Sequence, residues 1–582
     1  MIYILCLIGA AAEERETFTL SPVIVTGTRT EAPVREIFPV DPEMKLSVPE
    51  ALKEIPGLDL QTRGPLGAQA DISIRGSTYQ QILILIDGIR VNDPQTAHHN
   101  MDLPVPVCAI EKIEVLKGAA SAVYGADAFG GVINIITKTV GKENISLGFG
   151  YGSNNTQNYE LSFENTLGAI NERVYFERLS SDGYRYDTDF LNYSFLSQTA
   201  YKYAGGEASL KLGYMNKAFG AFDFYTPGRN FPSKEWTKTY FAEAGTKNEL
   251  AARLSLEVKT YFRKHDDTFM LNLATPTLFV NNHVTYDYGA EAEGTLKLSP
   301  DDLLVLGAEA GQEEIYSSNL GDHKSPRQAV FTELNGQIIK DLKIDAGLRL
   351  ESSFWGPILA PSIALSIRPF ENIKITVSAG SSFRSPSFTE LYYADGVSFG
   401  NALLKPETAV SYELGVNYSC CENLSAKVAL YARDETNLID WVGDTPTGKW
   451  NAQNIGQASV YGVEGTLKAR IEAFEINTGA SFIYAKKDLE YYSKYALLYP
   501  AAQGSFSIKG PAVFETVPEI GILYKRKAGV NEYTLLNAKL TRTLGGITVF
   551  VEGQNLTNVS YEEIKGIPQP GITFSTGIKI IL

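Results

Sequence analysis

A polar stretch at residues 92–100 contains two adjacent histidines, His98 and His99, whose imidazole nitrogens could contact a metal complex. Asn92, Gln95 and Asn100 belong to the same candidate surface. Because two adjacent side chains cannot easily ligate one ion together, a structured turn without a metal is the alternative. The stretch is therefore a candidate ligand-contacting loop.

An acidic segment at residues 182–189 is a second candidate site. Asp182, Asp187 and Asp189 could supply the carboxylate oxygens that Ca²⁺ prefers. Their spacing matches no established calcium-binding pattern, so ordinary solvated loop charge is the alternative.

Catalytic signatures are absent from the sequence, which contains neither a Gly-x-Ser-x-Gly elbow nor a His-Glu-x-x-His pair. Residues 125–131 are rich in glycine but lack the Lys-Ser/Thr pair of a phosphate-binding loop. The net charge of −15 argues against binding to a nucleic-acid backbone. The chain is therefore not expected to be an enzyme, and no cofactor is required.

The chain divides into two parts with different patterns. Residues up to about 138 mix helical and strand signals, as expected of a compact α/β domain. The segments expected to be regular are a helix at 46–55, ended by Pro56-Gly57, and strands at 71–75, 82–86, 110–116 and 132–137.

Residues 139–582 consist almost entirely of alternating strands and turns. Ile145, Leu147 and Phe149 share one strand face, and Ser146 and Gly148 share the other. The sequence has no apolar run long enough for a membrane helix, so a membrane-spanning form must be a closed β-barrel. At roughly 20 residues per strand and connection, this part accommodates about 22 antiparallel strands, a size at which the lumen needs a plug.

Connections of two kinds are expected to alternate, which would place short turns at one rim of the barrel and ligand-facing loops at the other. Short turns are predicted around residues 299–302, 368–372 and 419–423. Long irregular stretches are predicted at 218–236, 266–283, 312–328, 384–408 and 486–502.

The first residues suggest export. Residues 1–12 are apolar and end in three alanines, as at the end of a secretory signal peptide. Val23, Ile24, Val25 and Thr26 then form a short β-branched segment. Such a segment can add as a strand to the sheet edge of a partner, and an ordinary strand of the first domain is the alternative.

Several motifs resemble those of the TonB-dependent outer-membrane receptors over nearly the whole chain. The motifs in the first part are Ile74-Arg75-Gly76, Leu85-Ile86-Asp87-Gly88, Ile110-Glu111-Lys112-Ile113-Glu114-Val115 and Gly130-Gly131-Val132-Ile133-Asn134-Ile135. Those in the second part are Phe383-Arg384-Ser385-Pro386, Leu404-Lys405-Pro406-Glu407, Tyr461-Gly462-Val463-Glu464 and Gln554-Asn555-Leu556-Thr557-Asn558.

This resemblance implies a transmembrane β-barrel in the bacterial outer membrane, contacting lipid, with an N-terminal α/β plug domain in its lumen. The implied division is a signal peptide at 1–12, a TonB-box segment at 13–30, a plug at 31–138 and a barrel at 139–582. TonB is the implied partner, and it would pull on Val23–Thr26 using the inner-membrane proton-motive force. The chain is expected to be a monomer.

The resemblance also implies plug cations paired with barrel carboxylates. The candidate residues of this plug–barrel lock are Arg75, Lys117, Glu390, Glu407 and Glu413. Such buried pairs are specific without being reliably stabilising, which suits a plug that moves. Independent solvated charges in the lumen are the alternative.

The expected ligand is a small-molecule metal chelate. Overall length and plug motifs resemble the cobalamin-receptor branch most, with a ferric-siderophore receptor as the close alternative. A passive porin and a surface protein that binds without transport are less favoured, because the chain has plug motifs and a TonB-box-like segment.

Overall fold

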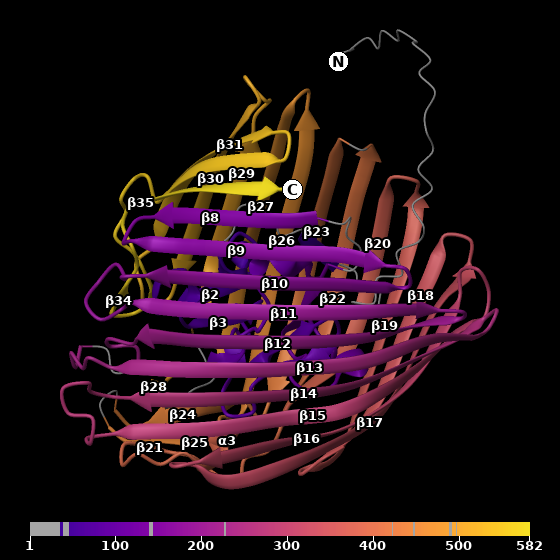
Figure 1. The fold of residues 1–582 in the computed structure, drawn as a ribbon. Coiled ribbons are helices and arrows are strands. Elements are labelled where there is room, and N and C mark those ends of the chain that lie inside the picture. The colour runs from indigo at the N-terminus through magenta and orange to yellow at the C-terminus, as the bar shows by residue number, and fades with distance from the viewer. Residues whose placement is uncertain are drawn as a thin grey trace, which may run out of the picture.

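The computed structural model describes residues 35–38, 46–138, 144–225, 228–421, 423–445, 448–487, 492–495 and 498–582. These residues form a closed barrel of 22 antiparallel strands around an N-terminal plug, which confirms the predicted fold class (Figure 1). The expected signal peptide and the segment Val23, Ile24, Val25 and Thr26 lie outside the described residues.

The barrel is one continuous sheet in which each strand pairs with its neighbour, and β35 closes it by pairing with β8. Its strands in chain order are β8 (Asn144–Gly152), β9 (Thr156–Leu167), β10 (Ile170–Ser181), β11 (Phe190–Tyr203), β12 (Gly206–Gly220), β13 (Lys234–Ala251), β14 (Leu254–Met270), β15 (Val280–Lys297), β16 (Leu303–Ser317), β17 (Gly321–Ile339), β18 (Leu342–Ser353), β19 (Gly356–Phe370), β20 (Ile373–Arg384), β22 (Glu407–Cys421), β23 (Leu424–Thr436), β26 (Gln457–Ile471), β27 (Phe474–Lys487), β29 (Pro500–Lys509), β30 (Thr516–Lys527), β31 (Tyr533–Leu544), β32 (Ile547–Gln554) and β35 (Thr573–Ile581).

The alternation in β8 corresponds to the two faces of the barrel wall. Ile145, Leu147 and Phe149 are each more than 40% exposed, whereas Ser146 between them is 8% exposed. Large apolar side chains on the outer face suit lipid, and small or polar side chains face the lumen. Among the described residues, no helix is both long and apolar enough to cross a membrane.

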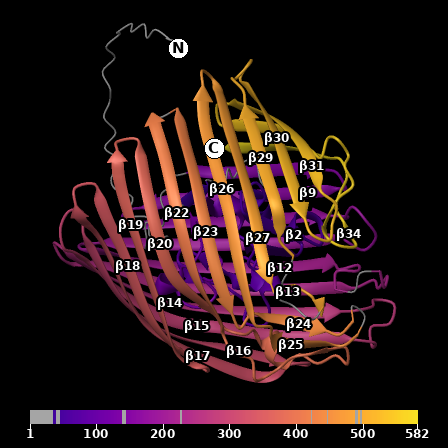
Figure 2. The ribbon, with the colours of Figure 1, turned by 180° about the vertical axis from the view of Figure 1, so that it is seen from behind.

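The plug lies inside the barrel and is surrounded by its wall (Figures 1 and 2). Its central sheet has the order β1-β6-β7-β4-β5, with β4 and β7 parallel. The plug elements are β1 (Arg35–Phe38), α1 (Val48–Leu52), β2 (Leu58–Thr62), β3 (Ala70–Ile74), β4 (Ile82–Ile86), β5 (Ile89–Arg90), β6 (Ile110–Lys117), α2 (Ser121–Tyr124), β7 (Gly131–Thr137) and four short 3₁₀ turns, η1 (Pro65–Gly67), η2 (Tyr79–Gln81), η3 (Ala97–His99) and η4 (Val107–Ala109).

Helix α1 is shorter than the predicted helix at 46–55. It begins after Ser47, whose hydroxyl accepts a hydrogen bond from the Glu50 amide, and Pro49 occupies its first turn. It ends at Leu52, because the following residues turn toward Pro56-Gly57 and the chain enters β2. The helix therefore makes little more than one turn.

Longer connections gather at one rim, at the left in Figure 1. They carry α3 (Phe388–Tyr392) and a small sheet of β21 (Ser398–Phe399), β25 (Trp450–Asn454), β24 (Ile439–Gly443) and β28 (Tyr492–Ser493), together with the pair β33 (Glu562–Ile564) and β34 (Ile567–Pro568). The three predicted short turns lie at the opposite ends of their strands.

The prediction of an irregular stretch at 312–328 is wrong. These residues belong to β16 and β17, which pair residue by residue up to Ser317 and Gly321. Strand pairing depends on backbone hydrogen bonds and not on side-chain polarity. A hairpin with polar side chains can therefore extend the barrel wall beyond the part that faces lipid.

Candidate ligand site at the plug apex

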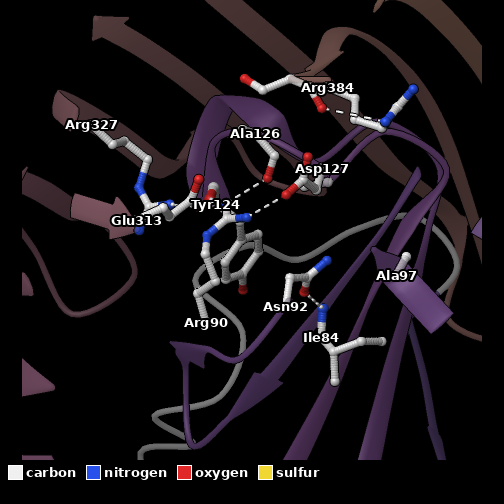
Figure 3. A network of polar contacts seen from close by, with 12 residues as sticks. Ile84, Arg90, Asn92, Ala97, Tyr124, Ala126, Asp127, Glu313, Arg327 and Arg384 are labelled. Carbon is white, nitrogen blue, oxygen red and sulfur yellow. Dashed lines mark hydrogen bonds and ion pairs between the residues drawn. The ribbon is translucent and has the colours of Figure 1, made fainter. Parts of the chain in front are cut away.

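The amides of Asn92 and Asn100 hold the backbone of the apical loop. Asn92 accepts a hydrogen bond from the Ile84 amide at 2.7 Å, as Figure 3 shows, and donates one to the Ile82 carbonyl at 2.9 Å. Asn100 accepts a hydrogen bond from the Asp93 amide at 2.9 Å. Both side chains are buried, so their role in this structure is to shape the loop.

Arg90, which lies just before the loop, joins this part of the plug to the residues that follow α2. Arg90 pairs with Asp127 at 2.6 Å and donates a hydrogen bond to the Ala126 carbonyl (Figure 3). On the facing barrel wall, Arg327 pairs with Glu313 at 2.9 Å. One charge pair thus belongs to the plug and the other to the barrel wall, and a pocket lined by Asp127, Glu313 and Arg327 lies between them.

His98 belongs to a group of rings that we call the apical aromatic cluster, defined as Tyr79, His98, Tyr225 and Tyr495. The His98 ring stacks on Tyr79 with a centroid distance of 4.5 Å, and Tyr495 meets Tyr79 edge-on at 5.5 Å. Tyr225 lies 6.1 Å from His98 and is 36% exposed. The cluster thus joins the plug to two outer loops and presents part of its surface outward.

Asp71 anchors the cluster from beneath. Its carboxylate lies 2.8 Å from His98 Nδ1 and also pairs with Arg63. Burial alone would raise the pKa of Asp71, but Arg63 and His98 lower it to about 2. Burial lowers the pKa of His98 against the opposing effect of Asp71, so the ring is neutral at neutral pH.

His99 points to a different set of partners. Its Nε2 lies 3.5 Å from Asp267 on β14 and 3.8 Å from Glu235 on β13. Gln95 donates a hydrogen bond to the same Asp267 carboxylate at 3.2 Å. The tandem histidines are thus divided between an aromatic cluster and an acidic one, as adjacent side chains in a turn often are.

Arg75 crosses from the plug to the barrel wall. It donates hydrogen bonds to Glu413 at 2.6 Å and to Glu464 at 2.7 Å, and its guanidinium lies 4.3 Å above the ring of Tyr431. Lys117 lies 3.3 Å from the same Glu464. The predicted list of lock residues lacked Glu464, although the motif Tyr461-Gly462-Val463-Glu464 contains it.

The other two carboxylates of the predicted lock pair with a barrel cation. Arg384 lies 2.8 Å from Glu390 and 2.7 Å from Glu407. Glu407 still contacts the plug, because Gln81 donates a hydrogen bond to it at 2.8 Å. Glu390 caps α3 through Ser387 and thereby shapes an outer loop.

Further plug–barrel ion pairs have the opposite polarity to the predicted one. Asp59 on plug strand β2 lies 2.9 Å from Lys525 and 2.8 Å from Lys527 on β30. Among the described residues, others are Asp87 with Lys211, Asp93 with Arg263 and Asp102 with Lys217. No local sequence signal marks these partners, because each pair joins segments far apart in the chain.

The three aspartates of the acidic segment lie in different surroundings. Asp182 is exposed, one oxygen of Asp187 is buried without a hydrogen-bond partner, and Asp189 pairs with Lys234 at 2.9 Å. Within the described part of the chain, two groups of three potential ligands converge to within 4.8 Å, and neither includes these residues. Calcium binding there stays a prediction.

Fold and site together define a class of protein: an outer-membrane β-barrel receptor whose lumen is filled by a plug held through ion pairs. The second part of the chain matches the family described as TonB dependent receptor-like, beta-barrel, over residues 125–556, and residues 41–132 match the TonB-dependent Receptor Plug Domain. The chain belongs to the TonB-dependent receptor family.

Similar proteins include a vitamin B12 transporter BtuB from Vibrio vulnificus, 26% identical over 73% of this chain and 71% of that protein. A vitamin B12 transporter BtuB from Photobacterium profundum is 24% identical over 76% of this chain and 75% of its own. Among solved structures, the ferric enterobactin receptor PfeA from Pseudomonas aeruginosa has a TM-score of 0.79 at 18% identity, over 95% of this chain and 100% of that one. The siderophore receptor PirA from Acinetobacter baumannii has a TM-score of 0.77 at 16% identity, over 94% and 98%.

Proposed function

We propose that this receptor imports cobalamin, or a closely related corrinoid, across the outer membrane. The observation that carries the proposal is the similarity to proteins named vitamin B12 transporters over about three quarters of the chain. The solved siderophore receptors share the fold at lower identity, so they support the architecture and not a ligand.

The apical aromatic cluster supports a ligand of this shape. A corrinoid is a large, flat macrocycle with an apolar face and a rim of amides. Tyr225 and Tyr495 offer partly exposed rings suited to the apolar face of such a ligand, while the Tyr225 hydroxyl is bonded to Gln69 and Glu235. Beneath them, Arg63 is neutralised by Asp71, so this floor offers no free positive charge from Arg63 to an anionic chelate.

The energy for import would come through TonB. Val23, Ile24, Val25 and Thr26 would pair as a strand with a TonB sheet edge, using backbone hydrogen bonds. A pull on this segment would strain the ion pairs that Arg75 and Asp59 make with the barrel. Because buried pairs give specificity at little net stability, they can hold a plug that still moves.

The test is equilibrium binding of cyanocobalamin and of a panel of ferric siderophores to the detergent-purified receptor, with and without Ca²⁺. We expect cyanocobalamin to bind and the siderophores not to bind. Strengthening by Ca²⁺ would support a calcium site at Asp182, Asp187 and Asp189. Binding of siderophores alone would replace the corrinoid by a ferric chelate and leave the import mechanism intact.

A further inference from the structure

A buried group of metal-ligating side chains lies where the apical loop meets the barrel wall. It comprises His99 of the plug, Glu235 of β13 and Asp267 of β14, which are 4%, 1% and 3% exposed. We call these three residues the apical acidic triad. Its members come from three separate elements, so the fold and not a local sequence motif brings them together.

The spacing of the donor atoms fits a tetrahedral metal site. His99 Nε2 lies 3.5 Å from Asp267 Oδ2 and 3.8 Å from Glu235 Oε1. With metal–ligand bonds of about 2.0–2.1 Å, neighbouring donors in a tetrahedron are about 3.3–3.4 Å apart. His99 Nε2 is therefore within a few tenths of an ångström of tetrahedral spacing to each carboxylate, and all three donor atoms lie within 4.8 Å of one another.

The charges of the triad favour a divalent cation. Within the described residues, neither Glu235 nor Asp267 has a lysine or arginine within 4.0 Å, and His99 is the basic side chain that both contact. Asp267 Oδ1 is also buried without a hydrogen-bond partner. The two carboxylates accept hydrogen bonds from the Tyr225 hydroxyl at 2.9 Å and from Gln95 at 3.2 Å. Both donors are neutral, so a bound cation would still compensate the buried negative charge.

A third carboxylate lies on the other side of the His99 ring, as is usual for histidine ligands of metals. Asp102 Oδ2 lies 3.6 Å from His99 Nδ1, on the side of the ring away from Glu235 and Asp267. Asp102 is itself held by His265 at 3.1 Å and by Lys217. A carboxylate on this side of the ring favours the tautomer protonated on Nδ1, which leaves Nε2 free to bind a metal.

We propose that the apical acidic triad binds a divalent transition-metal ion of the zinc type, which joins the plug apex to strands β13 and β14. One imidazole and two carboxylates are a donor set suited to such ions. His283, which stands opposite Asp267 in the ladder, is buried beside the site. The inference does not depend on the identity of the imported nutrient.

The test uses the untagged full-length receptor in detergent, stripped of metal and titrated with Zn²⁺ against a chromophoric chelator. We expect one tight equivalent, and Co²⁺ should give the strong visible absorption of a four-coordinate site. Glu235→Gln and His99→Ala should weaken binding at least about 100-fold, because loss of even an outer partner commonly costs 10–100-fold.

His323→Ala is the control, because its ring stacks on Tyr392 and bonds to the Leu320 carbonyl, away from both the triad and the apical aromatic cluster. It should bind Zn²⁺ as the unaltered receptor does. Heat-modified mobility on gels verifies that each variant barrel is folded. The proposal is overturned if the unaltered receptor binds no Zn²⁺, or if Glu235→Gln binds it equally well. Cyanocobalamin binding, measured separately on the same samples, keeps failure of the metal site distinct from failure of the proposed function.

Discussion

Arg75 of the plug donates a hydrogen bond of 2.7 Å to Glu464 of barrel strand β26. Both side chains are almost fully buried, and Lys117 approaches the same carboxylate at 3.3 Å. Any displacement of the plug from the barrel would break this contact, because one partner belongs to the plug and the other to the barrel wall. The contact is therefore a natural point at which to test how firmly the plug is held.

Arg75→Ala should loosen the plug, because it leaves Glu413 and Glu464 buried with less compensation. Loss of one partner of a buried pair costs about 3 kcal/mol, or about 100-fold in an opening equilibrium. Cys108 reports opening, because it is 4% exposed in the plug core and burial raises its pKa well above its ordinary value. With the other cysteines replaced by serine, a maleimide should label Cys108 up to about 100-fold faster in Arg75→Ala than in the unaltered receptor.

Arg75→Met combined with Glu413→Gln is the control for this prediction. It removes one charge of each sign and leaves Lys117 beside Glu464. Labelling of Cys108 should be slower than in Arg75→Ala, because no uncompensated charge stays buried. Equal labelling of Arg75→Ala and the unaltered receptor would show that these charges do not hold the plug.

The ion pairs of Asp59 predict a dependence on pH. Burial alone would raise the pKa of Asp59, but Lys525 and Lys527 lower it well below its usual 3.8. The carboxylate therefore stabilises docking at pH values above the pKa of the unfolded state, and this contribution is lost as pH falls through the folded-state pKa.

Asp59→Asn should accordingly speed hydrogen exchange in the β2–β3 hairpin by a constant factor near neutral pH. The factor should shrink as the pH is lowered below about 4. Comparing the variant with the unaltered receptor at each pH cancels the intrinsic exchange rate. A factor that grows on acidification would contradict the assigned direction of the pKa shift.

Val25→Pro should abolish uptake without changing ligand binding. Proline lacks the backbone N–H that a strand added to TonB must donate. The measurement is uptake of labelled cyanocobalamin into cells, beside equilibrium binding to the purified receptor. Val25→Ile keeps the N–H and should transport normally; if it failed like the proline variant, backbone pairing would not be the mechanism.

Tyr225→Ala should weaken ligand binding about 2- to 10-fold, because an aromatic contact contributes about 0.5–1.5 kcal/mol beyond its area. Equilibrium binding of cyanocobalamin is the readout. Phe149→Ala is the control, because that ring is 43% exposed on the outer face of β8. Equal affinities for all three proteins would remove the apical aromatic cluster from the ligand site.

Ile578→Lys should destabilise the barrel by up to about 2–4 kcal/mol, the cost of a lysine facing lipid near the bilayer centre. Ile578 is 38% exposed on β35, where it pairs with Phe149 of β8. Ser575→Lys places the same charge on the opposite face and should be tolerated. The fraction of barrel that resists unfolding in detergent on gels measures both.

The sequence by itself determined the architecture, because side-chain alternation is a local property of a strand. Ile145, Leu147 and Phe149 already identified the lipid face, and the length of the alternating part indicated the 22 strands that the structure has. The strand at Ile82–Ile86 was likewise predicted with its observed bounds. Polar residues in β16 were misleading, because the part of a strand outside lipid does not need an apolar face.

The tertiary structure alone decided which charges meet. Asp59 and Lys525 are 466 positions apart, and barrel closure around the plug brings them within 2.9 Å. The same closure separates the adjacent His98 and His99 and sets His99 against Glu235 and Asp267. Ion pairing depends on distance in space, and no pattern along the chain encodes the distance between a plug and a wall that folds around it.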